Sequence, residues 1–438
     1  MTRPVLLLAP LIAGVDMLAE SHASAATGYC ARTPCKARGA RFLLLAGLLA
    51  SACAVALPDG YFDPAFPGSG RFAFDGDSLV PGNESRVGAI ALESNGNLFL
   101  GGPAIGTKDY WWLGELTGNG QFVSSFGANN AGRITSCQLG FSCATNNTWR
   151  DSALATPGTY LALANSLALT NQAANSVNTS VSNPVTVNDA SGWVVFNTTA
   201  VQADGKILAA GKGFYSVSDT KQRFGVARFT GGLASIDHGF NAVTDDGGVT
   251  FDGGVIPFLD PADAYEDVGQ ILVRPDGRIV LVGFGVDTVS NASKIELVQL
   301  NSDGSLDMTF GSKGVAEPKV YSSLTLTEVH AILDRAGRLF VVAAAGDDTR
   351  MRGTMIGTNG SPLWSLNDLP TGCVTAFAKA AAEDSAGRVL MGGTCHDSAD
   401  FGSGHYYFVV VRYHGDTGQR DSSFGINSVS LGWYDNTS

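Results

Sequence analysis

Carboxylate side chains are concentrated in one stretch of the chain, residues 244–267. No Lys or Arg occurs between Arg228 and Arg274, so the stretch contains no basic residue. Its seven carboxylates are Asp245, Asp246, Asp252, Asp260, Asp263, Glu266 and Asp267. Such a group can bind a cation, a basic partner or a sugar, and two of its members could serve as acid and base. The simpler interpretation is a solvated acidic loop, so we treat the seven as binding candidates and assign no catalytic residue.

One turn has part of a calcium-binding pattern. Asn301-Ser302-Asp303-Gly304, followed by Asp307, supplies carboxylate and carbonyl oxygens at short spacing. The equivalent turns elsewhere begin with Thr117, Thr230 and Thr358 and lack the pattern. Asn, Asp and Gly are also the residues that tight turns prefer, so turn formation explains the segment without a metal. We therefore predict no metal site.

The remaining residue types that could do chemistry are scattered. None of His238, His330, His396, His405 and His414 stands in a spacing that brings two metal ligands together, and only the last three border one loop. The chain has no Gly-x-Ser-x-Gly nucleophile motif, phosphate loop or dinucleotide fingerprint. The sequence thus predicts no cofactor and contains no recognisable catalytic motif.

Residues 1–56 have the features of an export signal. Lys36, Arg38 and Arg41 precede the apolar run from Phe42 to Leu49, which leads to Ala54-Val55-Ala56. We place cleavage after the last of these alanines. The mature protein is then exported to the periplasm, the cell surface or the extracellular space.

Two details of the leader allow other interpretations. An earlier signal, with its apolar region at residues 4–15 and cleavage after residue 25, would leave the apolar run at 42–49 on the mature chain. The second alternative is that Cys53 is lipidated. It lacks the large aliphatic residue that usually stands three positions before a lipidated cysteine. No later stretch approaches the ~20 apolar residues needed to cross a bilayer, so we predict no membrane span.

Export bears on the charge and the cysteines of the mature chain. Removing residues 1–56 removes five Lys or Arg and two Asp or Glu and takes the formal net charge from −12 to −15, which would repel nucleic acid. Four cysteines remain, Cys137, Cys143, Cys373 and Cys395, and an even number in an oxidising compartment favours two disulfides. Cys373 and Cys395 flank the turn at 385–387 symmetrically, so antiparallel pairing would place them opposite each other.

Two glycine turns recur about every 60 residues and define the elements that must position these side chains. The first turns are centred on Gly96, Gly205, Gly277, Gly337 and Gly387. The second turns carry Gly120, Gly232, Gly304, Gly360 and Gly418, which lie 23 to 31 residues further on. Apolar and β-branched runs flank the first turns, as at Ile271 to Val273 and Ile279 to Val282, and this is the pattern of a hairpin. A third strand runs into the second turn, which leaves little room for a helix.

A hydrophobic anchor follows each second turn, at Phe126, Phe240, Phe310, Leu366 and Phe424, and Asp63-Pro64-Ala65-Phe66 opens the series. A fourth short strand can follow each anchor. One four-stranded sheet cannot bury both of its faces, but sheets stacked around an axis can. We therefore predict an all-β protein in which residues 57–438 form a β-propeller of about five to six four-stranded blades, built from imperfect ~60-residue repeats. A two-sheet solenoid is the alternative.

The interval between Phe126 and Phe240 is longer than the others by ~55 residues. We predict an insertion near residues 135–190, and the same segment could instead conceal a degenerate sixth blade.

The third repeat carries a family resemblance. Pro275-Asp276-Gly277-Arg278, Asp303-Gly304-Ser305-Leu306-Asp307 and Thr309-Phe310-Gly311 together resemble the delta-60 repeat, found in secreted, mostly bacterial proteins. Over residues 60–428 the pattern is weaker, because Leu366 replaces the aromatic anchor and Thr230-Gly231-Gly232 departs from the second turn. The resemblance implies a β-propeller and export. It implies no catalytic residue.

These observations favour a secreted propeller that binds a partner or surface and has no enzymatic activity. Its ligand would be a protein, a glycan or a cation, and we expect a monomer. The alternative is an extracellular carbohydrate-active enzyme, a glycosidase or lyase, that uses carboxylates gathered at one mouth of the propeller, because propeller folds host both functions. Two acids from different repeats that converge in one pocket would favour the enzyme.

Overall fold

The computed structural model describes residues 84–85, 87–105, 110–127, 132–136, 138–139, 151–156, 159–163, 166–170, 177–182, 185–187, 192–215, 220–233, 235–240, 249–251, 253–256, 263–287, 290, 292–322, 324–345, 349–397, 406–425 and 429–433. These residues form strands, turns and one short 3-10 turn at Gly231–Leu233. None of their helices has the length and apolar character needed to cross a bilayer. The expected all-β architecture is confirmed.

The described strands form six antiparallel sheets, numbered here in chain order. Sheet 1 contains β1 (Glu84–Ser85), β2 (Ala89–Leu92), β3 (Leu98–Ile105), β4 (Tyr110–Leu116) and β5 (Arg133–Thr135). Sheet 2 contains β6 (Asp151–Thr156), β7 (Thr159–Leu163), β8 (Ser166–Thr170) and β9 (Val177–Ser182). Sheet 3 contains β10 (Val185–Val187), β11 (Gly192–Val201), β12 (Ile207–Phe214), β13 (Arg223–Phe229), β14 (Val249–Phe251) and β15 (Gly254–Ile256).

The last three sheets have four strands each, paired in sequence order. Sheet 4 contains β16 (Asp263–Val273), β17 (Ile279–Asp287), β18 (Ala292–Leu300) and β19 (Val315–Tyr321). Sheet 5 contains β20 (Leu326–Leu333), β21 (Leu339–Ala345), β22 (Met351–Ile356) and β23 (Pro362–Asp368). Sheet 6 contains β24 (Thr375–Glu383), β25 (Arg388–His396), β26 (Tyr406–His414) and β27 (Val429–Trp433).

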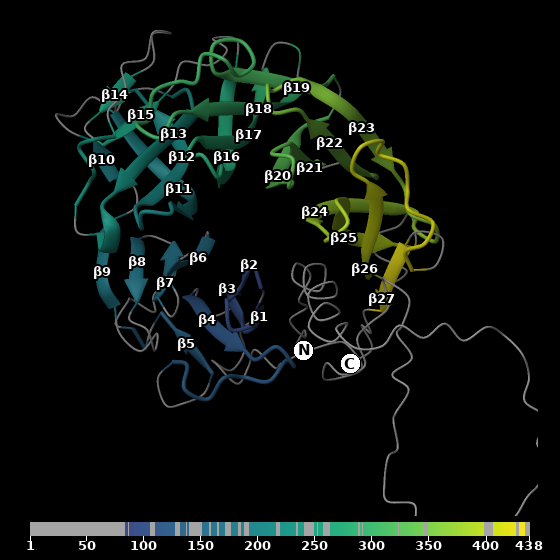
Figure 1. Cartoon of the computed structure of the whole chain (residues 1–438), viewed down its shortest axis with the longest axis horizontal. Coiled ribbons are helices and arrows are strands. Elements are labelled where there is room, and N and C mark those ends of the chain that lie inside the picture. The colour runs from purple at the N-terminus through teal and green to yellow at the C-terminus, as the bar shows by residue number, and fades with distance from the viewer. Residues whose placement is uncertain are drawn as a thin grey trace, which may run out of the picture.

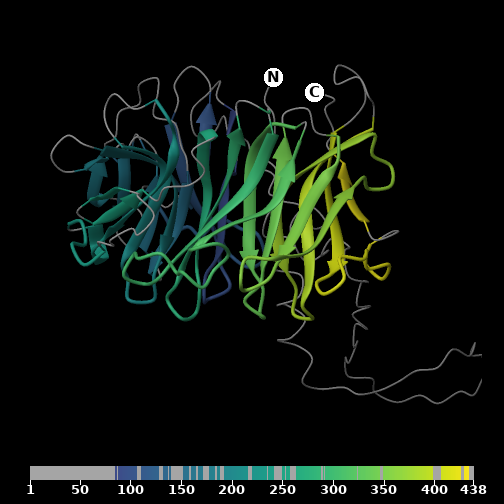
Figure 2. The same cartoon turned by 90° about the horizontal axis from the view of Figure 1, so that it is seen from above.

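The sheets follow one another around a central axis and form a propeller (Figure 1). β2, β6, β11, β16, β20 and β24 lie nearest the centre, and the inner strands of neighbouring sheets contact each other, for example β11 with β16 and β16 with β20. Seen from the side, the strands run between the two faces of the ring, which are formed by the hairpin loops (Figure 2). Sheet 2 lies in the long interval between the first two sequence repeats, and its strand β6 contacts β2 and β3 of sheet 1 and β11 of sheet 3.

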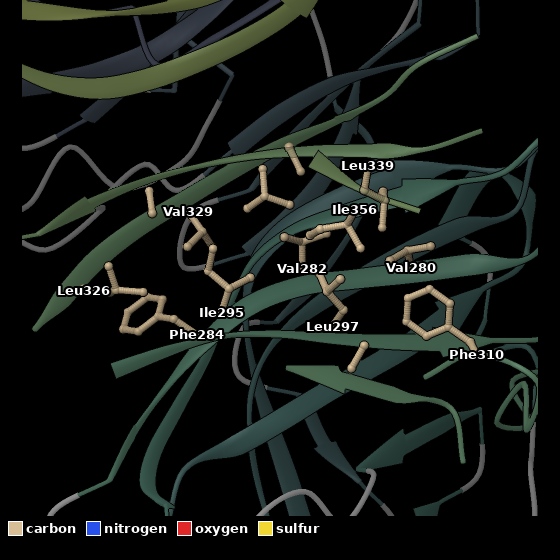
Figure 3. Packing of buried hydrophobic residues seen from close by; sticks show 14 of the residues in the cluster. Val280, Val282, Phe284, Ile295, Leu297, Phe310, Leu326, Val329, Leu339 and Ile356 are labelled. Atoms are coloured by element: carbon tan, nitrogen blue, oxygen red, sulfur yellow. The ribbon is translucent and has the colours of Figure 1, made fainter. Parts of the chain in front are cut away.

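Apolar side chains fill the spaces between sheets. Figure 3 shows the cluster between sheets 4 and 5, where Val280, Val282 and Leu297 meet Val329 and Leu339, and all five are at most 1% exposed. Because successive residues of a strand point to opposite faces, each sheet contributes to two such layers. Full burial of one Val or Leu side chain stabilises the fold by about 1.5–3 kcal/mol.

The recurrent Asp-x-x-Phe sequence builds a turn inside each of three sheets. In sheet 4, Asp307 Oδ1 accepts hydrogen bonds from the backbone N–H and hydroxyl of Thr309 at 3.0 and 2.6 Å. Its Oδ2 accepts from Gln299 at 2.6 Å and from Arg278 at 2.9 Å. The N–H of Phe310 donates to the Asp307 carbonyl at 3.0 Å. Both carboxylate oxygens of Asp307 therefore serve the turn.

Sheets 3 and 6 repeat this turn with an arginine on the third strand. Arg412 donates to Asp421 Oδ2 at 3.0 Å, and its guanidinium lies 4.6 Å from the centre of the Phe424 ring. Arg228 contacts Asp237 and the Phe240 ring in the same way, at 2.8 and 4.5 Å. Sheet 5 lacks the motif, and its expected anchor, Leu366, lies within β23 instead. The motif thus joins the outer part of a sheet to its third strand.

Arginines also connect neighbouring sheets by hydrogen bonds, at the ring face that carries the first turns. Arg228 of sheet 3 donates to the Ser302 carbonyl of sheet 4. Arg274 of sheet 4 donates to the Gly337 carbonyl of sheet 5 at 2.5 Å, and Arg335 of sheet 5 donates to the Ser385 carbonyl of sheet 6. A guanidinium has donors enough to serve its own sheet and the next one at once.

The predicted disulfide between Cys373 and Cys395 is present, with the Cα atoms 5.4 Å apart. It joins the residues just before β24 to the end of β25, and both cysteines are at most 9% exposed. In the chain-entropy model, closing a loop of this length stabilises the fold by roughly 3 kcal/mol. Cys137 and Cys143 lie outside the described residues.

The inner strands of sheets 3, 4 and 6 each contain a β-bulge. The extra residues are Asn197, Gly269 and Lys379, and each lies eight residues before the glycine of the first turn. Opposite each bulge the second strand has a glycine: Gly211, Gly283 or Gly393. A Cβ added there would lie only 1.9 to 2.1 Å from an inner-strand carbonyl oxygen. The bulge therefore requires glycine at this place.

Sheet 5 shows what happens without that glycine. Ala343 stands at the equivalent place, six residues after the turn glycine Gly337. The bulge of β20 lies at Thr327, between Leu326 and Glu328, closer to the start of the strand. A Cβ at position 343 excludes the close approach of the carbonyl, and the irregularity of β20 lies opposite Ala344 and Ala345 instead.

We predict that Gly283→Ala destabilises the protein by about 1–3 kcal/mol, because the new Cβ must displace the Asp267 carbonyl. Gly353→Ala is the matched control, since the atoms nearest to its Cβ belong to the side chains of Phe340 and Leu366 and not to the backbone. Urea unfolding of both variants measures the difference. Equal losses in the two variants would show that the bulge does not depend on Gly283.

The buried turn carboxylates should make stability depend on pH. Burial opposes ionisation of Asp421, but the hydrogen bonds from Ser423 and the charges of Arg412 and Arg388 outweigh it and lower the pKa from 3.8 to about 2. A lowered folded-state pKa contributes stability above the unfolded pKa, and this is lost as pH falls through the folded value. We predict that Asp421→Asn costs about 2 kcal/mol at pH 7 and that its deficit shrinks between pH 4 and pH 2.

Denaturant midpoints measured across this pH range test the prediction for Asp421. Asp416→Asn is the control, because the Asp416 side chain is 88% exposed. A deficit of Asp421→Asn that is independent of pH would contradict it.

Candidate functional site

Two of the seven sequence candidates have described side chains, and they are neighbours on the inner strand of sheet 4. Glu266 and Asp267 lie near the start of β16, and Asp263 is its first residue. Adjacent strand residues point to opposite faces, so Glu266 and Asp267 do not act together. Asp245, Asp246, Asp252 and Asp260 lie outside the described residues.

Asp267 is the centre of a polar group that joins sheets 3 and 4. Asn197, the bulge residue of β11, donates to Asp267 Oδ1 at 2.5 Å. Lys212 of β12 lies 3.3 Å from Asp267 Oδ2 and donates to the Tyr265 hydroxyl at 2.8 Å. The Tyr265 hydroxyl in turn donates to Asp267 Oδ2 at 3.3 Å. We call Asn197, Lys212, Tyr265 and Asp267 the first axial cluster.

The charges of this cluster depend on one another. Burial raises the pKa of Asp267 above its usual value, against the lowering effect of Lys212 and Asn197. Burial also opposes the charge on Lys212, but the hydrogen bond to Tyr265 and the charge of Asp267 outweigh it and raise its pKa. The Lys212 and Asp267 side chains are 26% and 16% exposed, so solvent still reaches both. The ammonium therefore maintains a half-buried carboxylate in its charged form.

Glu266 lies on the other face, in a buried polar layer. It is 2% exposed and lies in register with Gly285 and Lys294. Lys294 Nζ lies 3.4 Å from Glu296 and 2.7 Å from Glu317. Glu266, Lys294 and Glu296 are at most 6% exposed, whereas Glu317 is 38% exposed, and we assign the layer to packing.

A second polar group lies on the inner strands of sheets 5 and 6. Lys379, the bulge residue of β24, donates to Glu328 Oε2 of β20 at 2.5 Å. His330 Nε2 lies 3.8 Å from the same oxygen. The interactions with His330 and Lys379 lower the pKa of Glu328 to about 2. The three side chains, which we call the second axial cluster, are 40–46% exposed.

The two axial clusters share one construction. Asn197 and Lys379 are bulge residues at the same place in their repeats, and each reaches a carboxylate on the inner strand of the preceding or following sheet. Sequence reasoning missed Asn197, Lys212, Tyr265, Glu328 and Lys379. The signal that could have found the bulge residues is their constant distance of eight residues from the first-turn glycine.

Of the three histidines that border one loop, the structure describes two, His396 and His414, and they lie apart. His396 is buried and stacks on Tyr406 at 4.3 Å between ring centres, at the start of β26. His414 is the last residue of β26, so the length of the strand separates the two. His405 lies outside the described residues.

Two segments of the chain match a family model described as a domain of unknown function (DUF5122) beta-propeller. The matches cover residues 202–231 and 274–310. Each begins just before a first turn and extends through the third strand of sheet 3 or sheet 4, and the second includes the Asp-x-x-Phe turn of sheet 4. No curated protein matches the sequence significantly.

Solved structures with a similar arrangement of strands are distant in sequence. An endo-arabinase from Bacteroides thetaiotaomicron is 10% identical, with 63% of this chain and 92% of that chain covered and a TM-score of 0.35. A family 117 glycoside hydrolase from Zobellia galactanivorans is 14% identical, with 76% and 86% covered and a TM-score of 0.33. An aldose sugar dehydrogenase from Streptomyces coelicolor is 14% identical, with 65% and 83% covered and a TM-score of 0.33.

We predict that Lys212→Met lowers the free energy of unfolding by about 1–2 kcal/mol at pH 7, because it leaves the Asp267 carboxylate half-buried without its cation. The pKa of Asp267 is already raised and rises further in this variant. The deficit should therefore shrink as pH falls and Asp267 takes up a proton. Unfolding curves at pH 7 and pH 4.5 measure it.

Two further variants control this experiment. Adding Asp267→Asn to Lys212→Met should recover most of the loss at pH 7. Lys206→Met should have a smaller effect, because its partner Asp237 keeps Arg228 at 2.8 Å. A loss that is the same at both pH values would refute the role assigned to Lys212.

Proposed function

We propose that this protein is an exported binding protein whose ligand contacts the two axial clusters on the inner strands of the propeller. The observation that carries the proposal is the pair of bulges at Asn197 and Lys379, whose side chains donate to carboxylates of a neighbouring inner strand. A bulge disrupts the strand ladder and is used in proteins to redirect a side chain.

The stability of the fold does not account for the second axial cluster. Glu328, His330 and Lys379 are close to half exposed. Exposed ion pairs typically contribute about 0–1 kcal/mol. Polar groups that are accessible, close together and of little structural value are suited to contact a ligand.

Export is the second part of the proposal. The leader at residues 1–56 and the even number of cysteines in the remaining chain support it. The disulfide between Cys373 and Cys395 is compatible with an oxidising compartment. The acidic charge of the chain argues against nucleic acid as the ligand.

A carbohydrate-active enzyme is the second candidate function. The observation in its favour is that Asp267 of β16 and Glu328 of β20 lie on neighbouring inner strands. Both carboxylates have a lysine partner. The pKa of Glu328 is about 2, and this value suits a permanently ionised group and not a general acid. We therefore rank binding above catalysis.

The test compares the purified wild-type protein with Lys212→Met/Asp267→Asn and Glu328→Gln/Lys379→Met on glycan and peptide arrays. We expect a ligand that both axial variants bind at least tenfold more weakly, because each lost charged hydrogen bond costs about 1.5–3 kcal/mol. Asp416→Asn should bind like wild type, since Asp416 is exposed and lies in the turn after β26. Unchanged binding by both axial variants would contradict the proposal. Turnover of a captured glycan that the variants abolish would favour the enzyme.

A further inference from the structure

The axial clusters are electrically balanced. Asp267 is paired with Lys212 at 3.3 Å, and Glu328 is paired with Lys379 at 2.5 Å. The four groups together carry no net charge at pH 7. A ligand with a large charge of either sign would leave one partner of each pair facing a like charge. The clusters therefore favour a ligand that is polar and neutral.

The second axial cluster presents an acceptor and a donor side by side. Glu328 Oε2 can accept a hydrogen bond, and the Lys379 ammonium has three hydrogens to donate. A hydroxyl group has one hydrogen to donate and two lone pairs to accept. Two hydroxyls on adjacent carbons are separated by about one hydrogen-bond length, so one can donate to Glu328 while the other accepts from Lys379. A vicinal diol matches this pair.

The same arrangement occurs again around the axis. In the first axial cluster Lys212 and Asn197 are donors, Asp267 is an acceptor, and the Tyr265 hydroxyl can be either. The inner strands of the two clusters are in contact through β16 and β20, where Ala331 N–H donates to Gln270 Oε1 at 2.7 Å. A repeated diol-binding pattern suits a ligand that itself repeats diols.

One aromatic side chain lies close to the second cluster along the chain. Phe377 is half-buried and precedes Lys379 by two residues on β24. Phe377 lies ten residues before the first-turn glycine of sheet 6, and Asp267 lies ten residues before that of sheet 4, so the two positions are equivalent. The apolar face of a sugar ring packs on aromatic side chains. Sequence position and partial exposure make Phe377 the aromatic group available to such a ring.

We infer that the axial clusters bind a neutral oligosaccharide, with vicinal hydroxyls on Glu328 and Lys379 and one sugar face on Phe377. This inference rests on the proposed function and specifies the ligand of the same site. Lys212, Asn197 and Asp267 contact a second sugar unit. Neutral here means free of carboxylate, sulfate, phosphate and amine groups.

The experiment measures binding of the wild-type protein to an array of neutral oligosaccharides, with sulfated, uronic-acid and amino-sugar arrays in parallel. We expect binding to neutral members only. Glu328→Gln/Lys379→Met should weaken it about tenfold or more, and Phe377→Ala by a similar factor. Lys319→Met, which removes one lysine charge from the outer strand β19, should leave it unchanged. Thermal melting of each variant checks that the fold is intact.

If Phe377→Ala lowers the melting temperature, Phe377→Leu replaces it, because leucine keeps apolar volume but has no ring. Phe377→Leu should show the same loss of binding. No binding to any neutral oligosaccharide, or preferential binding to a charged array, would overturn the inference. If a peptide or a charged glycan binds and is lost in the axial variants, the proposed function survives and only the ligand class is wrong. If axial variants change no binding at all, both fail.

Discussion

Every sheet in this ring depends on its neighbours, because four short strands have two apolar faces and cannot cover either of them. Trp111 and Trp112 show this directly: they are successive residues of β4, they point to opposite sides of sheet 1, and they belong to two different clusters while both are at most 1% exposed. The same holds for β17, whose alternate residues join the clusters on its two sides. A single sheet of this size cannot bury both of its faces, so each sheet is stabilised by packing on its neighbours.

The need to pack around an axis also explains the unusual features of the inner strands. These strands are closest together at the centre of the ring (Figure 1). The bulges at Asn197, Gly269 and Lys379 locally increase the twist of the strand, and the glycines opposite them allow the backbone to approach. The contacts of Asn197 and Lys379 with carboxylates of neighbouring inner strands thus follow from the packing geometry. The bulge residue is Asn in sheet 3 and Lys in sheet 6, where sheet 4 has Gly, and the proposed function rests on this difference.

Local features of the structure could be predicted from the sequence, and contacts between distant repeats could not. The hairpins follow from glycines with positive φ, such as Gly205 at 81° and Gly277 at 87°, and a residue type reveals that need without any tertiary information. The disulfide followed from its symmetry about one turn. By contrast, Asn197 reaches Asp267 across 70 residues and Lys379 reaches Glu328 across 51, and such pairings depend on how sheets stack. A further blade near residues 135–190 was only an alternative to an insertion, because that segment lacks the second-turn and Asp-x-x-Phe patterns.

The Asp-x-x-Phe turn has a consequence for how proteins of this kind are compared. Its carboxylate, its aromatic ring and the arginine between them contact one another within one sheet, at Asp421, Phe424 and Arg412 as at Asp237, Phe240 and Arg228. Selection that preserves these residues therefore preserves a building block. Two chains that share the motif share one way of making a blade, while the residue eight positions before the first-turn glycine differs even within this chain, where it is Asn197, Gly269 or Lys379. The turn motif and the bulge residues should therefore evolve independently. Proteins grouped by the motif should differ from proteins grouped by their bulge residues.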